Sequence, residues 1–184
     1  MRNKQVQALT LSAMFLAIGQ VLPFITGQIP TIGAMLSPMH LPVLLCGFIV
    51  GPMYGAIVGI ICPLLRSVLF QMPRMYPTAI AMAFELCTYG FVSGFMFRYL
   101  KQKSIKNIYI SLISAMIIGR LIWGIAQYVL LGFSNNTFTF NAFITGALIN
   151  AVPAIIIQLI LIPLLVKALD RYIVNQWLPF LMLI

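Results

Sequence analysis

Acidic residues are almost absent from this chain of 184 residues, which holds two of them against eleven lysines and arginines and one histidine. Charged residues make up 7% of the sequence, whereas a soluble domain carries about 25%. Hydrophobic residues make up 62%. So few charges among so many apolar residues exclude an ordinary soluble domain, and we expect an integral membrane protein.

Several motifs of catalysis and binding are also missing from the sequence. The chain has no G-x-x-x-x-G-K-[ST] loop, which excludes that mode of ATP binding. It has no H-E-x-x-H or Ser/His/Asp arrangement, and a single histidine argues against a metal site. Cys46, Cys62 and Cys87 lie inside apolar runs, so we expect buried thiols and no disulfide. We therefore expect no enzyme activity, no cofactor and no metal.

The apolar runs themselves predict the fold class. A spanning helix needs about 20 apolar residues, which leaves room for six. We predict an all-α polytopic membrane protein with six transmembrane helices, forming a single domain over residues 1–184. Arg2 and Lys4 precede the first apolar run as in a signal peptide, but no cleavage pattern follows, so we expect a retained helix. The predicted helices run about Gln5–Phe24, Leu36–Val50, Pro52–Phe70, Pro77–Tyr99, Ile108–Leu131 and Ala142–Leu169, with an apolar tail at Trp177–Ile184.

Two local patterns refine this topology. Pro38 and Pro42 lie near the start of the second predicted helix and indicate an irregular first turn. Six spans put both termini and the 100–107 connection on one side of the membrane. The basic residues on that side are Arg2, Lys4, Arg98, Lys101, Lys103, Lys106, Lys167 and Arg171. The outer connections hold one basic residue, Arg74. The positive-inside rule therefore predicts a multi-pass cell-membrane protein with both termini cytoplasmic.

Ionisable residues inside the apolar spans predict a functional site, because burying a charge there costs about 2.5–3.5 kcal/mol or more. Glu85 lies in the fourth predicted helix, Arg66 in the third and Arg120 in the fifth. Either an Arg–Glu pair merely holds helices together, or these groups line a ligand pocket open to the outside. We expect both arginines to face the one glutamate, which leaves a donor unpaired and favours the pocket. The candidate substrate-binding residues are His40, Arg66, Arg74, Tyr76, Glu85, Arg120, Trp123, Gln127, Tyr128 and Asn150.

Some of these candidates also fit a structural role. His40 suits a bond to the backbone at a helix start as well as a ligand contact. Trp123 and Tyr128 suit packing or the membrane interface as well as stacking on a ligand. The uncharged segment Gly27–Gly33 lies beside the proposed pocket, and we expect it to be either a lid that closes over ligand or an ordinary turn.

Small residues recur at four-residue spacing, which lets helix backbones approach closely. The pairs are Ala13 with Ala17, Gly55 with Gly59, and Gly90 with Gly94. We expect both glycine pairs to serve packing within the chain. The first helix has a second small face, made by Ala8, Ser12 and Gly19. We therefore expect one of its faces to pack inward and the other to meet a partner protein.

The stretch HLPVLLCGFIVGPMYGAIVGIICPLLRS (40–67), taken with Ala13-x-x-x-Ala17, resembles the substrate-binding S components of energy-coupling factor (ECF) vitamin transporters. The resemblance covers nearly the whole chain. It implies a membrane bundle that captures a small water-soluble vitamin from outside, between the ends of its last three helices and the loops after the first, third and fifth. It also implies partners, namely a transmembrane coupling subunit and two ATPase subunits, with docking at Ala13 and Ala17. Within the family, the chain is most similar to members assigned to hydroxymethylpyrimidine or pyridoxine.

Two other functions stay open at this stage. One is an S component for an anionic vitamin such as pantothenate, whose carboxylate the spare arginine would hold. The other is a stand-alone, proton-linked secondary carrier that uses Glu85. In every case the excess of arginine over glutamate in the spans predicts that strongly cationic ligands are rejected, because low dielectric strengthens repulsion between like charges.

Overall fold

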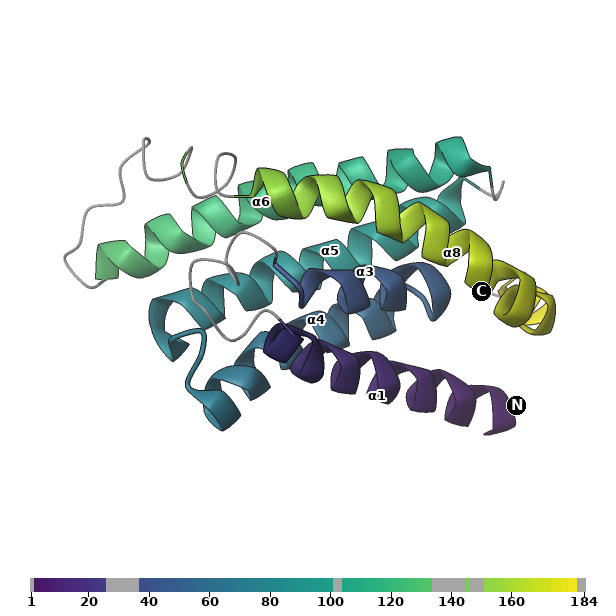
Figure 1. Ribbon diagram of the computed structural model, residues 1–184, viewed down its shortest axis with the longest axis horizontal. Coiled ribbons are helices and arrows are strands. Elements are labelled where there is room, and N and C mark those ends of the chain that lie inside the picture. The colour runs from purple at the N-terminus through teal and green to yellow at the C-terminus, as the bar shows by residue number, and fades with distance from the viewer. Residues whose placement is uncertain (1, 26–36, 101–103, 134–144, 146–150, 182–184) are drawn as a thin grey trace.

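The computed structural model describes the backbone of residues 2–25, 37–100, 104–133, 145 and 151–181. Side chains are described at 4–24, 37–100, 104–132, 145 and 151–169. These parts of the chain are helical, with short turns and no strand between them (Figure 1). The helices are α1 (Arg2–Ile25), α3 (His40–Ile49), α4 (Pro52–Phe70), η1 (Met75–Ala79), α5 (Ile80–Tyr99), α6 (Ile105–Phe133) and α8 (Val152–Leu181).

Five helical segments are long and apolar enough to cross a membrane. They are Lys4–Phe24, Pro52–Phe70, Met75–Tyr99, Ile105–Gly132 and Val152–Leu169. The chain is therefore a polytopic all-α membrane protein, whereas the sixth span stays a prediction. Helix α3 has only ten residues, because the turn from Ser37 to Met39, with Pro38 inside it, comes first and delays the helix until His40. Helix α8 continues to Leu181, so the expected separate tail is helical as far as that residue.

Helix α5 lies at the centre of the bundle, in contact with α3, α4 and α6. Helix α1 packs on α3 and α4, and α8 packs on α3 and α6. Helix α1 begins at the same end of the molecule at which α8 finishes (Figure 1). Lys4, Arg98, Lys106 and Lys167 lie in the helix segments near that end, whereas Arg74 lies in the turn between α4 and α5 at the other. This arrangement agrees with the predicted segregation of charge.

Glycines let α3, α4 and α5 meet backbone to backbone. A Cβ atom added to Gly90 would lie 2.2 Å from the carbonyl oxygen of Gly55, and one added to Gly94 would lie 2.5 Å from that of Gly47. At Gly59 the same atom would lie 2.3 Å from a backbone oxygen of α5. Real Cβ atoms do not come so close, so no larger residue fits without moving a helix. This confirms that both glycine pairs serve packing within the chain.

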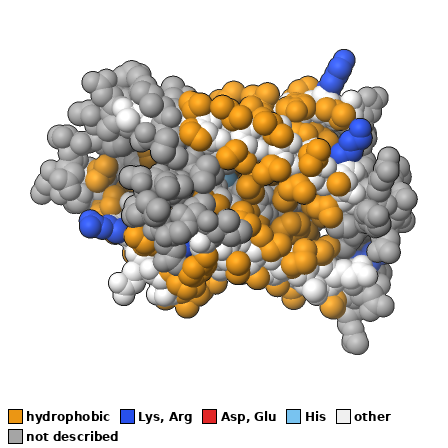
Figure 2. Space-filling view, in the orientation of Figure 1, with side chains coloured by type: hydrophobic (Ala, Val, Ile, Leu, Met, Phe, Trp, Pro, Cys, Tyr) orange, Lys and Arg blue, Asp and Glu red, His pale blue; other side chains and the backbone are white. Residues whose placement is uncertain are grey.

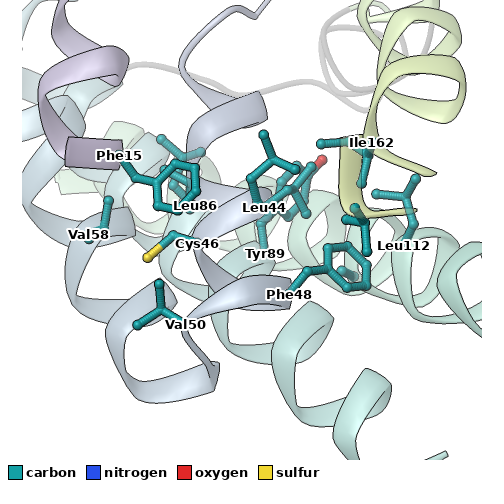
Figure 3. Close-up of a cluster of buried hydrophobic side chains, with 14 of the residues drawn as sticks. Phe15, Leu44, Cys46, Phe48, Val50, Val58, Leu86, Tyr89, Leu112 and Ile162 are labelled. Atoms are coloured by element: carbon teal, nitrogen blue, oxygen red, sulfur yellow. The ribbon is translucent and has the colours of Figure 1, made fainter. Parts of the chain in front are cut away.

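The apolar core gathers around α3, which is almost wholly buried. Figure 3 shows side chains from α1, α3, α4, α5, α6 and α8 meeting there. The labelled members are Phe15, Leu44, Cys46, Phe48, Val50, Val58, Leu86, Tyr89, Leu112 and Ile162. The outer surface in the middle of the bundle is also hydrophobic, with Lys and Arg side chains toward the two ends (Figure 2). An apolar belt between basic ends is the surface that a bilayer covers.

The two small faces of α1 point in different directions. Ala8, Ser12 and Gly19 are buried, and a Cβ added to Gly19 would lie 2.6 Å from the Cys62 sulfur of α4. Ala13 and Ala17 are exposed. The prediction that one small face packs inward is confirmed, and the other face is left uncovered by this chain.

Candidate functional site

The only glutamate of the chain is buried where α3, α5 and α6 meet. Glu85, on α5, is 1% exposed. Its Oε1 atom lies 3.0 Å from Nη1 of Arg120 on α6 and 3.5 Å from Nε2 of His40 on α3. The predicted pairing of Glu85 with Arg120 is therefore present, and His40 adds a third ionisable group to it.

Local packing brings these three helices close enough for the contact. A Cβ added to Gly119, the neighbour of Arg120, would lie 2.1 Å from the ring of Tyr89, so the glycine lets that ring lie against the backbone of α6. Tyr89 is fully buried one turn after Glu85. The His40 ring packs on it edge to face, with centroids 5.3 Å apart and an angle of 66°. Tyr89 thus holds both α6 and the start of α3 beside the carboxylate.

The cluster leaves hydrogen-bonding capacity unused. Within the described part of the chain, Nδ1 of His40 and Nε of Arg120 are buried without a hydrogen-bond partner, and Nε2 of His40 and the Tyr89 hydroxyl lie beside Glu85 without a well-directed hydrogen bond. The close Oε1 atom of Glu85 also lacks a well-directed hydrogen bond. A buried polar atom without a partner costs about 1–3 kcal/mol, and most such atoms in proteins are paired. A polar ligand at this position would supply the missing partners.

Arg66 lies in a different place from the one expected. Its Nη1 donates to the backbone oxygen of Gln20 at 2.7 Å, and its guanidinium lies 5.2 Å from the ring centre of Phe24 and 5.1 Å from that of Phe70. The expectation that two arginines face Glu85 is therefore met by Arg120 alone. The reason is the close contact between α1 and α4 at Gly19, which brings a carbonyl of α1 within reach of Arg66.

The α6 candidates divide between two faces. Gln127 is 7% exposed and lies seven residues after Arg120, so both occupy one face of the helix. Trp123 lies between them on the same face and is half-buried. Tyr128 is 67% exposed and belongs to the outer surface, where the alternative role of an interface residue suits it better.

Two further candidates, Arg74 and Tyr76, lie in the connection between α4 and α5. Arg74 is exposed just before η1. Tyr76 is 43% exposed, and its hydroxyl donates to the backbone oxygen of Leu130, which ties η1 to α6. Asn150 and the proposed lid Gly27–Gly33 lie outside the described residues.

Sequence reasoning missed Tyr89 and Gln158. Gln158, on α8, is 1% exposed, and neither its amide oxygen nor its amide nitrogen has a hydrogen-bond partner. The available signal was an amide within a strongly apolar predicted span. Tyr89 gave no such signal, because a tyrosine in a membrane helix is common near interfaces. Within the described residues, no group of three or more His, Cys, Asp or Glu side chains is placed to hold a metal ion.

Comparison with known families gives one match. The model of the family described as "ECF transporter, substrate-specific component" matches residues 7–166. No curated protein and no solved structure matches the chain. The family match covers most of the 184 residues and agrees with the helical membrane fold.

Membership of this family indicates the general function of the chain. Members of this family are subunits of a transporter and not enzymes, they bind a small molecule, and they work with ECF coupling and ATPase subunits. The chain belongs to the family of substrate-specific components of ECF transporters and is a membrane-embedded substrate-binding subunit.

Proposed function

We propose that this subunit captures a hydroxymethylpyrimidine- or pyridoxine-like vitamin from outside the cell and hands it on with the help of the coupling and ATPase subunits. One observation carries the proposal: a glutamate that is 1% exposed inside a membrane span, flanked by Arg120 and His40, with neighbouring polar atoms left unpaired. Ionisable groups inside membrane spans are costly and rare, and they mark substrate and ion pathways, proton relays and ligand counter-ions.

The chemistry of the cluster suits a neutral or weakly basic heteroaromatic ring with hydroxyl groups. Glu85 accepts a hydrogen bond from a hydroxyl or ring N–H. Arg120 and His40 donate to a ring nitrogen or a hydroxyl oxygen. Trp123 offers an aromatic face on the same side of α6 for stacking. A few polar groups within an apolar surround are what a small-ligand site requires.

The position of Arg66 argues against an anionic vitamin. The pantothenate alternative needs an arginine that is free to hold a carboxylate in a two-pronged contact. Arg66 already donates to Gln20 and lies beside two phenylalanine rings that contact each other, while Arg120 is paired with Glu85. Neither arginine is therefore placed to serve an anion without giving up a partner.

Calorimetry on the purified chain tests the ligand class. We expect tight binding of hydroxymethylpyrimidine or pyridoxine and weak binding of pantothenate and of the cation thiamine. Tight binding of thiamine contradicts the charge argument. Uptake into vesicles separates the transport classes: the chain alone binds ligand without moving it, and transport appears only with the coupling subunits. Proton-driven uptake by the chain alone favours the secondary carrier.

We further propose that both termini face the cytoplasm. The support is the charge segregation between the two ends of the bundle. Single cysteines in place of Lys103 and Asn136 test this topology, because an impermeant thiol reagent labels only cysteines that face the outside of intact cells. We expect label at 136 and none at 103 in intact cells, and labelling of 103 from outside rules out the six-helix topology.

A further inference from the structure

The amide of Gln158 is the most conspicuous polar group that the Glu85 cluster does not include. Its side chain is 1% exposed, and both amide atoms lack a hydrogen-bond partner. A glutamine amide has an acceptor oxygen and a donor nitrogen side by side. Burial without partners is costly, so a residue kept in this state inside an apolar helix points to a partner that arrives from outside the chain.

Helical register places Gln158 at the level of the candidate site. Gln158 lies four residues before Ile162, so both point from one face of α8, and Ile162 is fully buried in the core cluster beside Leu44 of α3 (Figure 3). His40 lies four residues before Leu44. Helices α3 and α8 pack on each other and run in the same direction (Figure 1). His40 and Gln158 therefore each stand one turn beyond the same apolar layer, toward the same end.

We infer that Gln158 is a specificity-determining residue that reads a ligand edge on which a hydrogen-bond acceptor and an N–H donor are adjacent. This inference rests on the proposed function and narrows it. The paired amide atoms of Gln158 match an acceptor ring nitrogen next to an exocyclic amino group. An aminopyrimidine such as hydroxymethylpyrimidine has this edge. The ring nitrogen of pyridoxine lies between a methyl-bearing carbon and a C–H carbon, so pyridoxine lacks it.

A purely structural glutamine would behave differently on mutation. If the amide held helices together, its loss would lower stability. Because the amide has no hydrogen-bond partner among the residues that the structure describes, leucine in its place removes a buried polar group without breaking a bond, which is neutral or stabilising for the free protein. The substitution Gln158→Leu should therefore leave the stability of the free protein unchanged or raise it, while it lowers the affinity for the ligand.

The test compares Gln158→Leu with Gln20→Leu. Gln20 is a matched control, since its Nε2 donates to the backbone oxygen of Cys62 at 2.9 Å and so joins α1 to α4. Each purified protein is melted without ligand and titrated with hydroxymethylpyrimidine, with pyridoxine and with the pyrimidine that carries hydrogen in place of the amino group. We expect Gln158→Leu to bind hydroxymethylpyrimidine at least about tenfold more weakly and to melt no lower than wild type. Gln20→Leu should melt lower and keep its affinity.

The outcomes separate this inference from the proposed function. Wild type that binds pyridoxine but not hydroxymethylpyrimidine overturns the role of Gln158 and leaves the proposed function standing. Equal affinity of wild type for the pyrimidines with and without the amino group also overturns it, as does unchanged hydroxymethylpyrimidine affinity in Gln158→Leu. A Gln158→Leu protein that melts lower and binds more weakly shows a structural role. Wild type that binds neither vitamin overturns both conclusions.

Discussion

The two halves of α5 meet α3 in different ways. From Gly90 onward the helix meets α3 and α4 through glycine backbones, with no space for a single added carbon. Near its end, Arg98 donates to the backbone oxygen of Val50 at 2.9 Å and so caps α3. From Ile80 to Tyr89 the same helix carries Glu85 and Tyr89, and in the described part of the chain neither Oε1 of Glu85 nor the Tyr89 hydroxyl makes a well-directed hydrogen bond.

The contrast shows how a membrane protein keeps unpaired polar groups in place. Close packing of the glycine half fixes the position and rotation of α5. The polar side chains between Ile80 and Tyr89 therefore cannot turn out of the core, and the neighbouring helices cannot close around them. Such pre-organisation reduces the conformational entropy that the protein loses on binding, because the side chains that receive the ligand are already ordered. Four variants test this division.

Leucine at Gly90 should disrupt the packing of α4 against α5. Its Cβ would overlap the carbonyl of Gly55, and neither backbone can move without separating α4 from α5. We expect Gly90→Leu to yield no monodisperse protein in size-exclusion chromatography. Gly132→Leu is the control, because no atom lies within 4 Å of a Cβ added there. A Gly90→Leu protein with wild-type yield and melting contradicts the close packing described here.

Leucines at Ala13 and Ala17 should leave both halves of α5 untouched. Both alanines are exposed on α1, on the face that this chain does not cover. We expect the double variant to bind vitamin normally but to lose co-purification with the coupling subunit and uptake, since bulky side chains separate helices that must touch. Ala168→Leu, at an exposed alanine of α8, is the matched control. Lost binding with intact assembly shows that the docking face has been misassigned.

Glutamine at Glu85 should weaken ligand binding without changing the glycine contacts of α5. We expect a hydroxylated heteroaromatic ligand to lose about 1–3 kcal/mol of binding free energy, the cost of losing a charged hydrogen-bond partner. An anion such as pantothenate should bind equally well or better, because a repelling charge is gone. Calorimetry measures both. Asp170→Asn makes the same chemical change at the other acidic residue of the sequence and should alter neither affinity. Unchanged binding of the heteroaromatic ligand in Glu85→Gln removes Glu85 from the site.

Methionine at Arg98 should give the smallest effect, on stability alone. The variant loses the hydrogen bond to Val50, and we expect about 1 kcal/mol less stability to unfolding with ligand affinity unchanged. Denaturant melting of the free protein and calorimetry of the complex measure the two quantities. Lys106→Met, at an exposed position near the same end of the bundle, should alter neither. A drop in affinity would mean that the two halves of α5 are not independent.

Features that depend on short-range patterns could be predicted from the sequence. The spans follow from apolar length, and the buried face of α1 follows from small residues at helical spacing. The pairing of Glu85 with Arg120 follows from the scarcity of acids, because a buried carboxylate in a bilayer needs a cation and few are available. The glycine contacts follow from four-residue spacing on adjacent helices.

Features that depend on which helices become neighbours could not be predicted. Arg66 and Arg120 look alike in sequence, yet Arg66 finds a backbone oxygen of α1 because two helices touch at Gly19. The lack of partners for Gln158 is visible only once α8 has been placed against α3 and α6. Pro38 and Pro42 indicated an irregular start of α3. They did not indicate that the helix would have only ten residues.

That short helix has an electrostatic consequence. Ten residues at 1.5 Å each extend about 15 Å, half of a hydrocarbon core of about 30 Å. The first residue of α3 is His40, whose ring reaches Glu85, so the amino end of the helix lies beside the carboxylate. Aligned peptide dipoles give that end a positive potential equivalent to about half an elementary charge. By beginning in the interior of the bundle, α3 directs its dipole at the one glutamate that the chain contains, and the backbone itself becomes a counter-charge within the membrane.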